Sequence, residues 1–123
     1  GKLCIKNAIE KAIPGNTIGD VSNSLQSTAQ KGNANYVTNY AGHAIGKELW
    51  LEPQIPSFGK PNTGPILEKG MLFCVENQIT YGDARLEMDE DGWTLRTMDG
   101  SKSVMFEDMI LITSDGAEVL TAE

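Results

Sequence analysis

The chain has 123 residues, of which 40% are hydrophobic and 22% charged, and this composition fits one folded domain spanning residues 1–123. Its net charge of -7 argues against nucleic acid as a ligand, because a phosphate backbone needs a clustered basic face. No apolar run approaches the roughly 20 residues that span a bilayer. The two cysteines lie in apolar settings and form no disulfide framework, so we expect a cytoplasmic protein with no membrane partner.

Two helices are predicted at the start of the chain. The first covers residues 2–13 and is closed by Pro14-Gly15. The second is capped by Asn16-Thr17, with Asp20 completing an acidic capping box, and ends at Gly32. The apolar positions at helical spacing are Leu3, Ile5, Ala8, Ile9, Ala12 and Ile13 in the first helix, and Ile18, Val21, Leu25 and Ala29 in the second.

From Tyr36 onward the pattern changes to strands joined by turns. The predicted strands are 36–40, 71–76, 85–88, 93–97, 103–113 and 118–120. Residues 52–65 contain four of the five prolines and are predicted to form an ordered surface loop. Two helices followed by an antiparallel sheet define an α+β domain.

One histidine and two glutamates are candidates for a metal site. His43 is the only histidine, and the small residues on either side of it let a backbone or ligand come close. Glu76 and Glu107 each stand among apolar residues, where an unpaired carboxylate is costly. A shared metal would resolve the burial of all three side chains together.

Each candidate also has a structural interpretation. A single histidine in a glycine-rich strand end is commonly a hydrogen-bonding residue, and either glutamate could face water at a sheet edge. The spacing of the three residues matches no short metal motif. The acidic run Asp89-Glu90-Asp91 lacks the EF-hand pattern and is interpreted as a solvated turn. Nucleophilic serine chemistry is not expected, since no second histidine or Gly-x-Ser-x-Gly motif is present.

Several motifs, in order, resemble the C-terminal part of type I methionine aminopeptidases. They run over nearly the whole chain, which makes the resemblance specific. They are Gly42-His43-Ala44-Ile45-Gly46, Glu52-Pro53-Gln54-Ile55-Pro56, Gly70-Met71-x-Phe73-x-Val75-Glu76, Asp91-Gly92-Trp93-Thr94, Phe106-Glu107 and Asp115-Gly116-Ala117-Glu118-Val119-Leu120-Thr121.

The resemblance implies half of a pita-bread fold, with two N-terminal helices packed on a curved antiparallel sheet. It implies metal-dependent removal of N-terminal methionine from peptides and new proteins. His43, Glu76 and Glu107 fall on metal ligands, with Glu107 bridging two ions and Glu76 also handling the proton of the attacking water. Trp93, Trp50 and Leu49 fall at the substrate pocket. The family uses two divalent ions, for which Co²⁺, Mn²⁺, Fe²⁺ and Zn²⁺ suit these donors.

The chain also departs from the family pattern. Trp50 stands where the family has a second histidine, and Asn77 follows Glu76 where proline is usual. The family's two aspartate ligands and a catalytic histidine belong to an N-terminal half that lies outside this chain. Three ligands would hold at most one ion, so we expect the N-terminal half or a homodimer to complete the site. A pita-bread relative that binds peptide or protein without cleaving it is the alternative.

Overall fold

The structure is a computed structural model that describes residues 1–122. The two helices are α1 (Lys2–Ile9) and α2 (Ile18–Lys31). The strands are β1 (Asn35–Tyr36), β2 (Ala41–Ala44), β3 (Leu51–Pro56), β4 (Leu72–Thr80), β5 (Leu86–Met88), β6 (Leu95–Thr97), β7 (Ser103–Ile112) and β8 (Ala117–Val119). This α+β arrangement confirms the predicted fold class.

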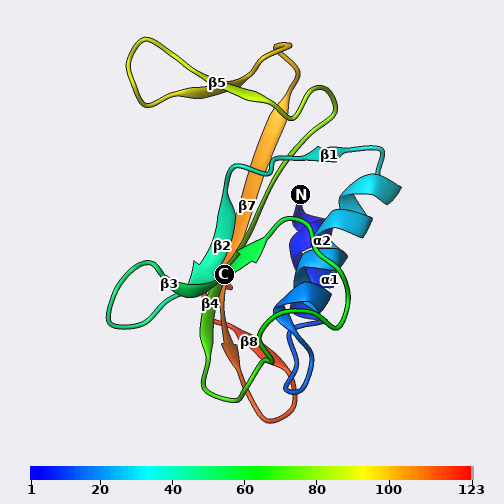
Figure 1. Ribbon diagram of the computed structural model, residues 1–123, viewed down its shortest axis with the longest axis vertical. Helices are drawn as coiled ribbons and strands as arrows, with labels where there is room; N and C mark the ends of the chain where they lie inside the picture. Colours follow the sequence, from blue (N-terminus) through cyan, green and yellow to red (C-terminus); the bar gives the residue numbers. More distant parts are fainter. Residues whose placement is uncertain (123) are drawn as a thin grey trace.

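An antiparallel sheet in the order β3-β2-β4-β7-β8 forms the body of the molecule, and β1 pairs with β4 on the same side as β2. The long strands β4 and β7 are paired over their whole length, from Leu72 opposite Leu111 to Thr80 opposite Ser103. A separate hairpin, β5–β6, projects from one end of this pair (Figure 1). The central strands therefore present one continuous face on each side of the sheet.

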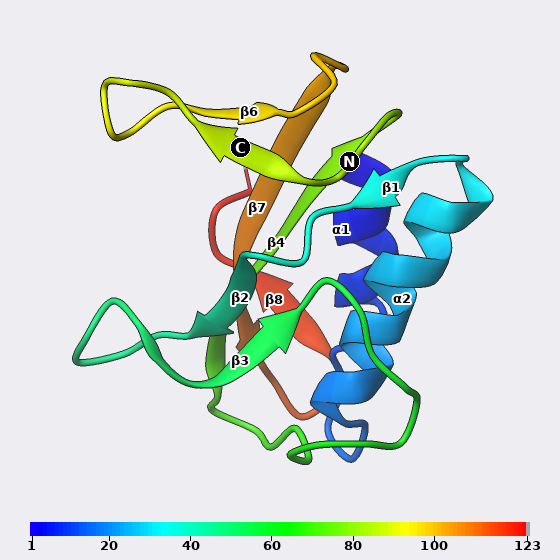
Figure 2. The same cartoon turned by 45° about the horizontal axis from the view of Figure 1, so that its top comes forward.

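Both helices cover one face of the sheet, and the β2–β3 loop and the β5–β6 hairpin project on the other side (Figure 2). The core lies between helices and sheet, and its largest buried side chains include Leu25 of α2, Phe73 of β4 and Ile110 of β7. Within residues 1–122, neither helix has the length and apolar character needed to cross a membrane. The face away from the helices is left open for a site.

The first helix is shorter than predicted. It ends at Ile9, and residues 10–11 form a tight turn in which Lys11 N–H donates to the Ala8 carbonyl at 3.0 Å. Pro14 disfavours helical backbone at Ile13, so the helix could not reach its predicted end. Leu3, one of the apolar positions at helical spacing, is 60% exposed, whereas Cys4 is buried in the core.

The second helix begins and ends as predicted. Thr17 is its N-cap and accepts a hydrogen bond from Asp20 N–H at 3.3 Å, while the Asp20 carboxylate accepts from Thr17 N–H at 2.8 Å. The same carboxylate accepts from Asn62 N–H at 3.1 Å, which attaches the 57–66 segment to the helix. The predicted apolar stripe, from Ile18 to Ala29, is buried. These hydrogen bonds lower the pKa of Asp20.

Replacing Asp20 with alanine is expected to reduce the free energy of unfolding by about 1 kcal/mol, the usual magnitude for a lost cap. Because the pKa of Asp20 is lower in the folded state, its contribution is present at neutral pH and is lost as the pH falls through that value. Denaturant unfolding at several pH values measures both effects. Glu10→Ala removes one negative charge but leaves the capping hydrogen bonds in place. An equal loss of unfolding free energy in that variant would contradict the prediction.

Two strand predictions were wrong in this part of the chain. The expected strand 36–40 is divided, because β1 stops at Tyr36 and residues 37–40 bend before β2 begins at Ala41. The expected loop 52–65 contains most of β3, which pairs with β2. Proline has no backbone N–H to donate to a neighbouring strand. An edge strand has a partner on one side only, so Pro53 and Pro56 are compatible with the position of β3.

One buried side chain of β4 has unsatisfied polar atoms. Asn77 is fully buried on the helix side of the sheet, and neither its Oδ1 nor its Nδ2 has a hydrogen-bond partner among residues 1–122. Replacing Asn77 with valine, which has high strand propensity, is expected to raise the free energy of unfolding by about 1–2 kcal/mol. Chemical denaturation measures the change. Asn35→Val removes an amide that donates to the Gly82 carbonyl and should give no gain.

Candidate metal centre

His43 lies in β2, between β3 and β4. It pairs with Gln54 on one side and with Cys74 on the other. Its side chain is only 9% exposed, and Nδ1 lies 3.0 Å from the Ala44 carbonyl oxygen. A carbonyl only accepts, so this contact assigns the proton to Nδ1 and leaves the Nε2 lone pair free. Backbone contacts of this kind orient metal-binding histidines.

The small residues beside His43 have the role that the sequence predicts for them. A Cβ atom added at Gly42 would lie 2.4 Å from the Cys74 carbonyl oxygen and 3.3 Å from Glu76 N. Only glycine therefore allows β2 to approach β4 this closely. The close approach places the imidazole beside the open face of β4.

Glu76 and Glu107 lie directly opposite each other on β4 and β7. Glu76 is buried as expected, whereas Glu107 is exposed, so the expected burial of Glu107 was wrong. Like charges in opposed positions on one face of a sheet are unfavourable. Burial raises the pKa of Glu76 and the charge of Glu107 adds to the increase, while a hydrogen bond from Gln78 Nε2 at 3.0 Å acts in the opposite direction. Neither glutamate forms a salt bridge with any residue in the range 1–122. A bound cation would relieve this repulsion.

A third donor atom, the sulfur of Cys74, lies among these side chains. One ring nitrogen of His43, Cys74 Sγ and one carboxylate oxygen of Glu107 all lie within 4.8 Å of one another. Glu76 is not in this group within residues 1–122, and its carboxylate contacts Gln78 instead. Burial raises the pKa of the Cys74 thiol to about 11, and the adjacent carboxylates of Glu107 and Glu76 contribute.

Cys74 was not among the residues that the sequence indicated as ligands. The signal was nevertheless present, because strict alternation along β4 puts Cys74 on the same face as Glu76 and puts Phe73 and Val75 in the core. The donor set fits a divalent ion: a histidine nitrogen with a free lone pair, two carboxylates without basic partners, and a thiol.

A groove of about 890 Å³ adjoins this cluster. Its walls are largely apolar and carry Trp50, 72% exposed, and Trp93, 86% exposed. The indole of Trp50 meets the His43 ring edge-on, with 6.4 Å between ring centroids. Leu49 is not one of the residues in 1–122 that line the groove. His43 and Glu76 also line the groove, and its other apolar residues include Val37, Tyr40, Leu51, Leu86, Leu95, Val104 and Met105.

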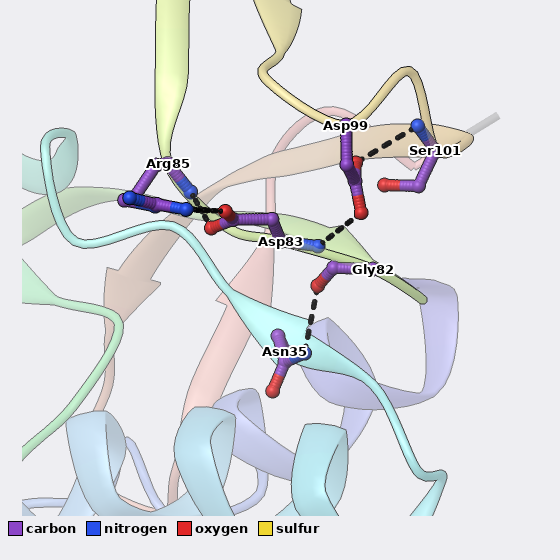
Figure 3. A network of polar contacts seen from close by, with 6 residues as sticks. All are labelled: Asn35, Gly82, Asp83, Arg85, Asp99 and Ser101. Carbon is purple, nitrogen blue, oxygen red and sulfur yellow. Dashed lines mark hydrogen bonds and ion pairs between the residues drawn. The ribbon is translucent and has the colours of Figure 1, made fainter.

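A polar network holds the β5–β6 hairpin that carries Trp93 (Figure 3). Asp99 accepts from Asp83 N–H at 2.7 Å and from Ser101 N–H at 3.0 Å. The Asn35 amide donates to the Gly82 carbonyl at 2.7 Å, which connects the hairpin base to β1. The hydrogen bond from Asp83 N–H is the main cause that lowers the pKa of Asp99 to about 2. The sequence predicted only a turn at Asp99, so this positioning role was missed.

Replacing Asp99 with alanine is expected to loosen the hairpin, because two backbone N–H groups lose their acceptor. Amide hydrogen exchange in β5 and β6 should become several-fold faster, with exchange in β4 unchanged. In the unsubstituted chain, the same protection should weaken as the pH falls from about 4 toward the Asp99 pKa of about 2. Glu90→Ala removes the same charge from the hairpin tip, and similar acceleration in that variant would contradict a specific role for Asp99.

The family model of metallopeptidase family M24 matches residues 2–114, and the chain belongs to this family. Methionine aminopeptidase A of Synechocystis sp. is 40% identical over 118 residues, which are 96% of this chain and 47% of that protein. A methionine aminopeptidase of Aquifex aeolicus is 37% identical over 124 aligned residues, which cover 98% of this chain and 47% of that protein. The chain therefore spans about half the length of the curated relatives it matches.

Solved structures confirm the pita-bread fold. The methionine aminopeptidase of Thermotoga maritima superimposes with a TM-score of 0.96 at 44% identity, over 99% of this chain and 49% of that chain. The Rickettsia prowazekii methionine aminopeptidase gives a TM-score of 0.92 at 38% identity, over 97% of this chain and 48% of that chain. The prolidase of Pyrococcus horikoshii gives 0.68 at 24% identity, which shows only a shared fold. The predicted resemblance to part of a type I methionine aminopeptidase is confirmed.

Proposed function

We propose that this chain forms one half of the catalytic site of a metallo-aminopeptidase that removes methionine from the N-terminus of peptides and new proteins. The observation that carries the proposal is that His43, Glu76 and Glu107 lie on the adjacent strands β2, β4 and β7, with Glu76 directly opposite Glu107 and neither carboxylate given a basic partner within residues 1–122. Relatives named methionine aminopeptidases support it. Such chemistry fits the cytoplasm, where new chains are made.

Each side chain has a distinct role in this proposal. His43 and Glu107 would hold metal, and Glu107 would serve as a ligand to both ions. Glu76 also binds metal and takes a proton from the attacking water, and Gln78 orients its carboxylate. When bound, divalent ions polarise the scissile carbonyl and lower the pKa of the water. The three side chains hold at most one ion, so the second needs ligands from an N-terminal half or from a second copy of this chain.

The groove accounts for selection of methionine in this proposal. Its apolar wall suits an unbranched thioether side chain, which gains free energy from leaving water. Trp93 and Trp50 supply most of the exposed aromatic surface there. Because Trp50 meets His43 edge-on, it also limits the space beside the candidate metal ligands.

Trp50 favours a second candidate function, binding of peptide or protein without cleavage. It stands where the family pattern has a histidine, and an indole can neither bind metal through a lone pair nor exchange a proton at neutral pH. In this alternative the groove and hairpin remain a peptide-binding surface. The two candidates differ in turnover rather than in binding.

Hydrolysis of Met-Ala-Ser with added Co²⁺ or Mn²⁺ tests the proposal, on the protein expressed from its natural gene and on the 123-residue chain. Release of methionine that is lost in Glu107→Gln and kept in Glu118→Gln is the expected result. Peptide binding without release by any form would favour the binding protein. If calorimetry detects neither metal uptake nor peptide binding, both candidates are wrong.

A further inference from the structure

Cys74 lies beside His43, on the neighbouring strand β4. Cys74 is 4% exposed, yet its sulfur lies on the open face of β4, opposite the core side chains Phe73 and Val75. It pairs directly with His43 across β2–β4, and Glu107 lies diagonally from it on β7, two residues from its partner Met109. Side chains in such positions on one face are within contact distance.

The position of the three donor atoms is set by strand register rather than by a loop. The close approach of β2 to β4 at Gly42 brings the imidazole beside the thiol. The hydrogen-bonded pairing of β4 with β7 holds the Glu107 carboxylate on the other side. One nitrogen, one sulfur and one oxygen thus lie within 4.8 Å of one another, so an ion placed among them could contact all three.

We infer that Cys74 binds metal together with His43 and Glu107, and that its sulfur makes this site selective for thiophilic ions such as Zn²⁺ over oxygen-preferring ions such as Mn²⁺. This inference rests on the proposed function, since it assigns a further ligand to the same centre. Three protein donors with an open fourth position are typical of catalytic zinc sites. Thiolate ligands favour zinc, whereas carboxylate and water favour manganese. The thiol proton leaves to solvent when the metal binds.

Glu76 then acts mainly as a proton-handling group. Its carboxylate is held by Gln78 and lies outside the group of three donors within residues 1–122. With His43, Cys74 and Glu107 as the ligands, metal binding and proton transfer belong to different side chains. With His43, Glu76 and Glu107 as the ligands, Glu76 would have to do both.

Cobalt substitution tests this inference in the protein expressed from its natural gene. The Co²⁺ form of the parent should show a thiolate-to-cobalt charge-transfer band in the near ultraviolet. The band should be absent in Cys74→Ser and retained in Cys4→Ser, which changes a thiol buried in α1. Zn²⁺ affinity should fall by at least about tenfold in Cys74→Ser, with a smaller change for Mn²⁺.

X-ray absorption of the zinc-loaded parent gives a second measurement that needs no variant. It should show one sulfur neighbour at about 2.3 Å. Zinc bound with nitrogen and oxygen neighbours only would overturn the inference and leave the proposed function intact. Failure of the parent to bind any divalent ion would overturn both. Equal Zn²⁺ affinity in the parent and Cys74→Ser would overturn the inference about Cys74 and leave the proposed function intact.

Discussion

Replacing Glu76 with glutamine is expected to lower kcat for methionine release by about 10²–10⁴-fold, the range for loss of a positioned general base. Glutamine keeps the size of the side chain and one oxygen that can accept from Gln78, but it cannot take a proton. KM should change little, because glutamine keeps the shape of this groove-lining side chain and the apolar residues of the groove are unchanged. Steady-state kinetics on Met-Ala-Ser, in the protein expressed from its natural gene, measures both constants.

Metal content distinguishes this result from simple loss of the centre. If Glu76 mainly transfers a proton, the variant should retain its metal and its fold, as measured by metal analysis and thermal unfolding. Gln78→Ala should reduce kcat by a smaller factor, because it removes only the hydrogen bond that orients the Glu76 carboxylate. Parent-like kcat in Glu76→Gln would exclude it as the base.

The parts of the fold that sequence predicts well are those with strong local signals. The capping box at Thr17 and the stripe of α2 define that helix completely, and alternation along 72–76 puts Phe73 and Val75 on one face, which is the core face in the structure. Prolines made β3 resemble a loop, since sequence alone does not indicate that a strand will lie at a sheet edge. Pro14 disfavours helical backbone at Ile13, but no local sequence signal marks the end of α1 at Ile9.

The candidate site is harder to predict because it depends on register between strands that are distant in sequence. His43, Glu76 and Glu107 were selected from their local apolar or small neighbours, and the sheet brings their strands together. Cys74 enters the cluster through its pairing with His43, and the sequence of neither strand determines that pairing by itself. The role of Asp99 is likewise a contact between two turns.

Replacing Gly42 with alanine is expected to reduce activity by about 10²-fold, the effect of moving a catalytic group by about 1 Å. The added Cβ would meet the Cys74 carbonyl oxygen at 2.4 Å, whereas ordinary contact begins at 3.4 Å, so β2 must move away from β4 by about 1 Å. His43 is the next residue and moves with the strand. Overpacking of this kind also costs about 1–3 kcal/mol in the free energy of unfolding.

Gly46→Ala is the matched control, because a Cβ there would meet only the end of the Leu51 side chain, at 3.4 Å. Its stability should stay within about 0.5 kcal/mol of the parent, the range for surface substitutions. Peptide hydrolysis and denaturant unfolding are measured on both variants. Since Gly42 touches neither metal nor substrate, a loss confined to Gly42→Ala would show that strand spacing positions the imidazole. Equal activity in the two variants would mean that the sheet adjusts without displacing His43, and that the close approach at Gly42 is not required by the site.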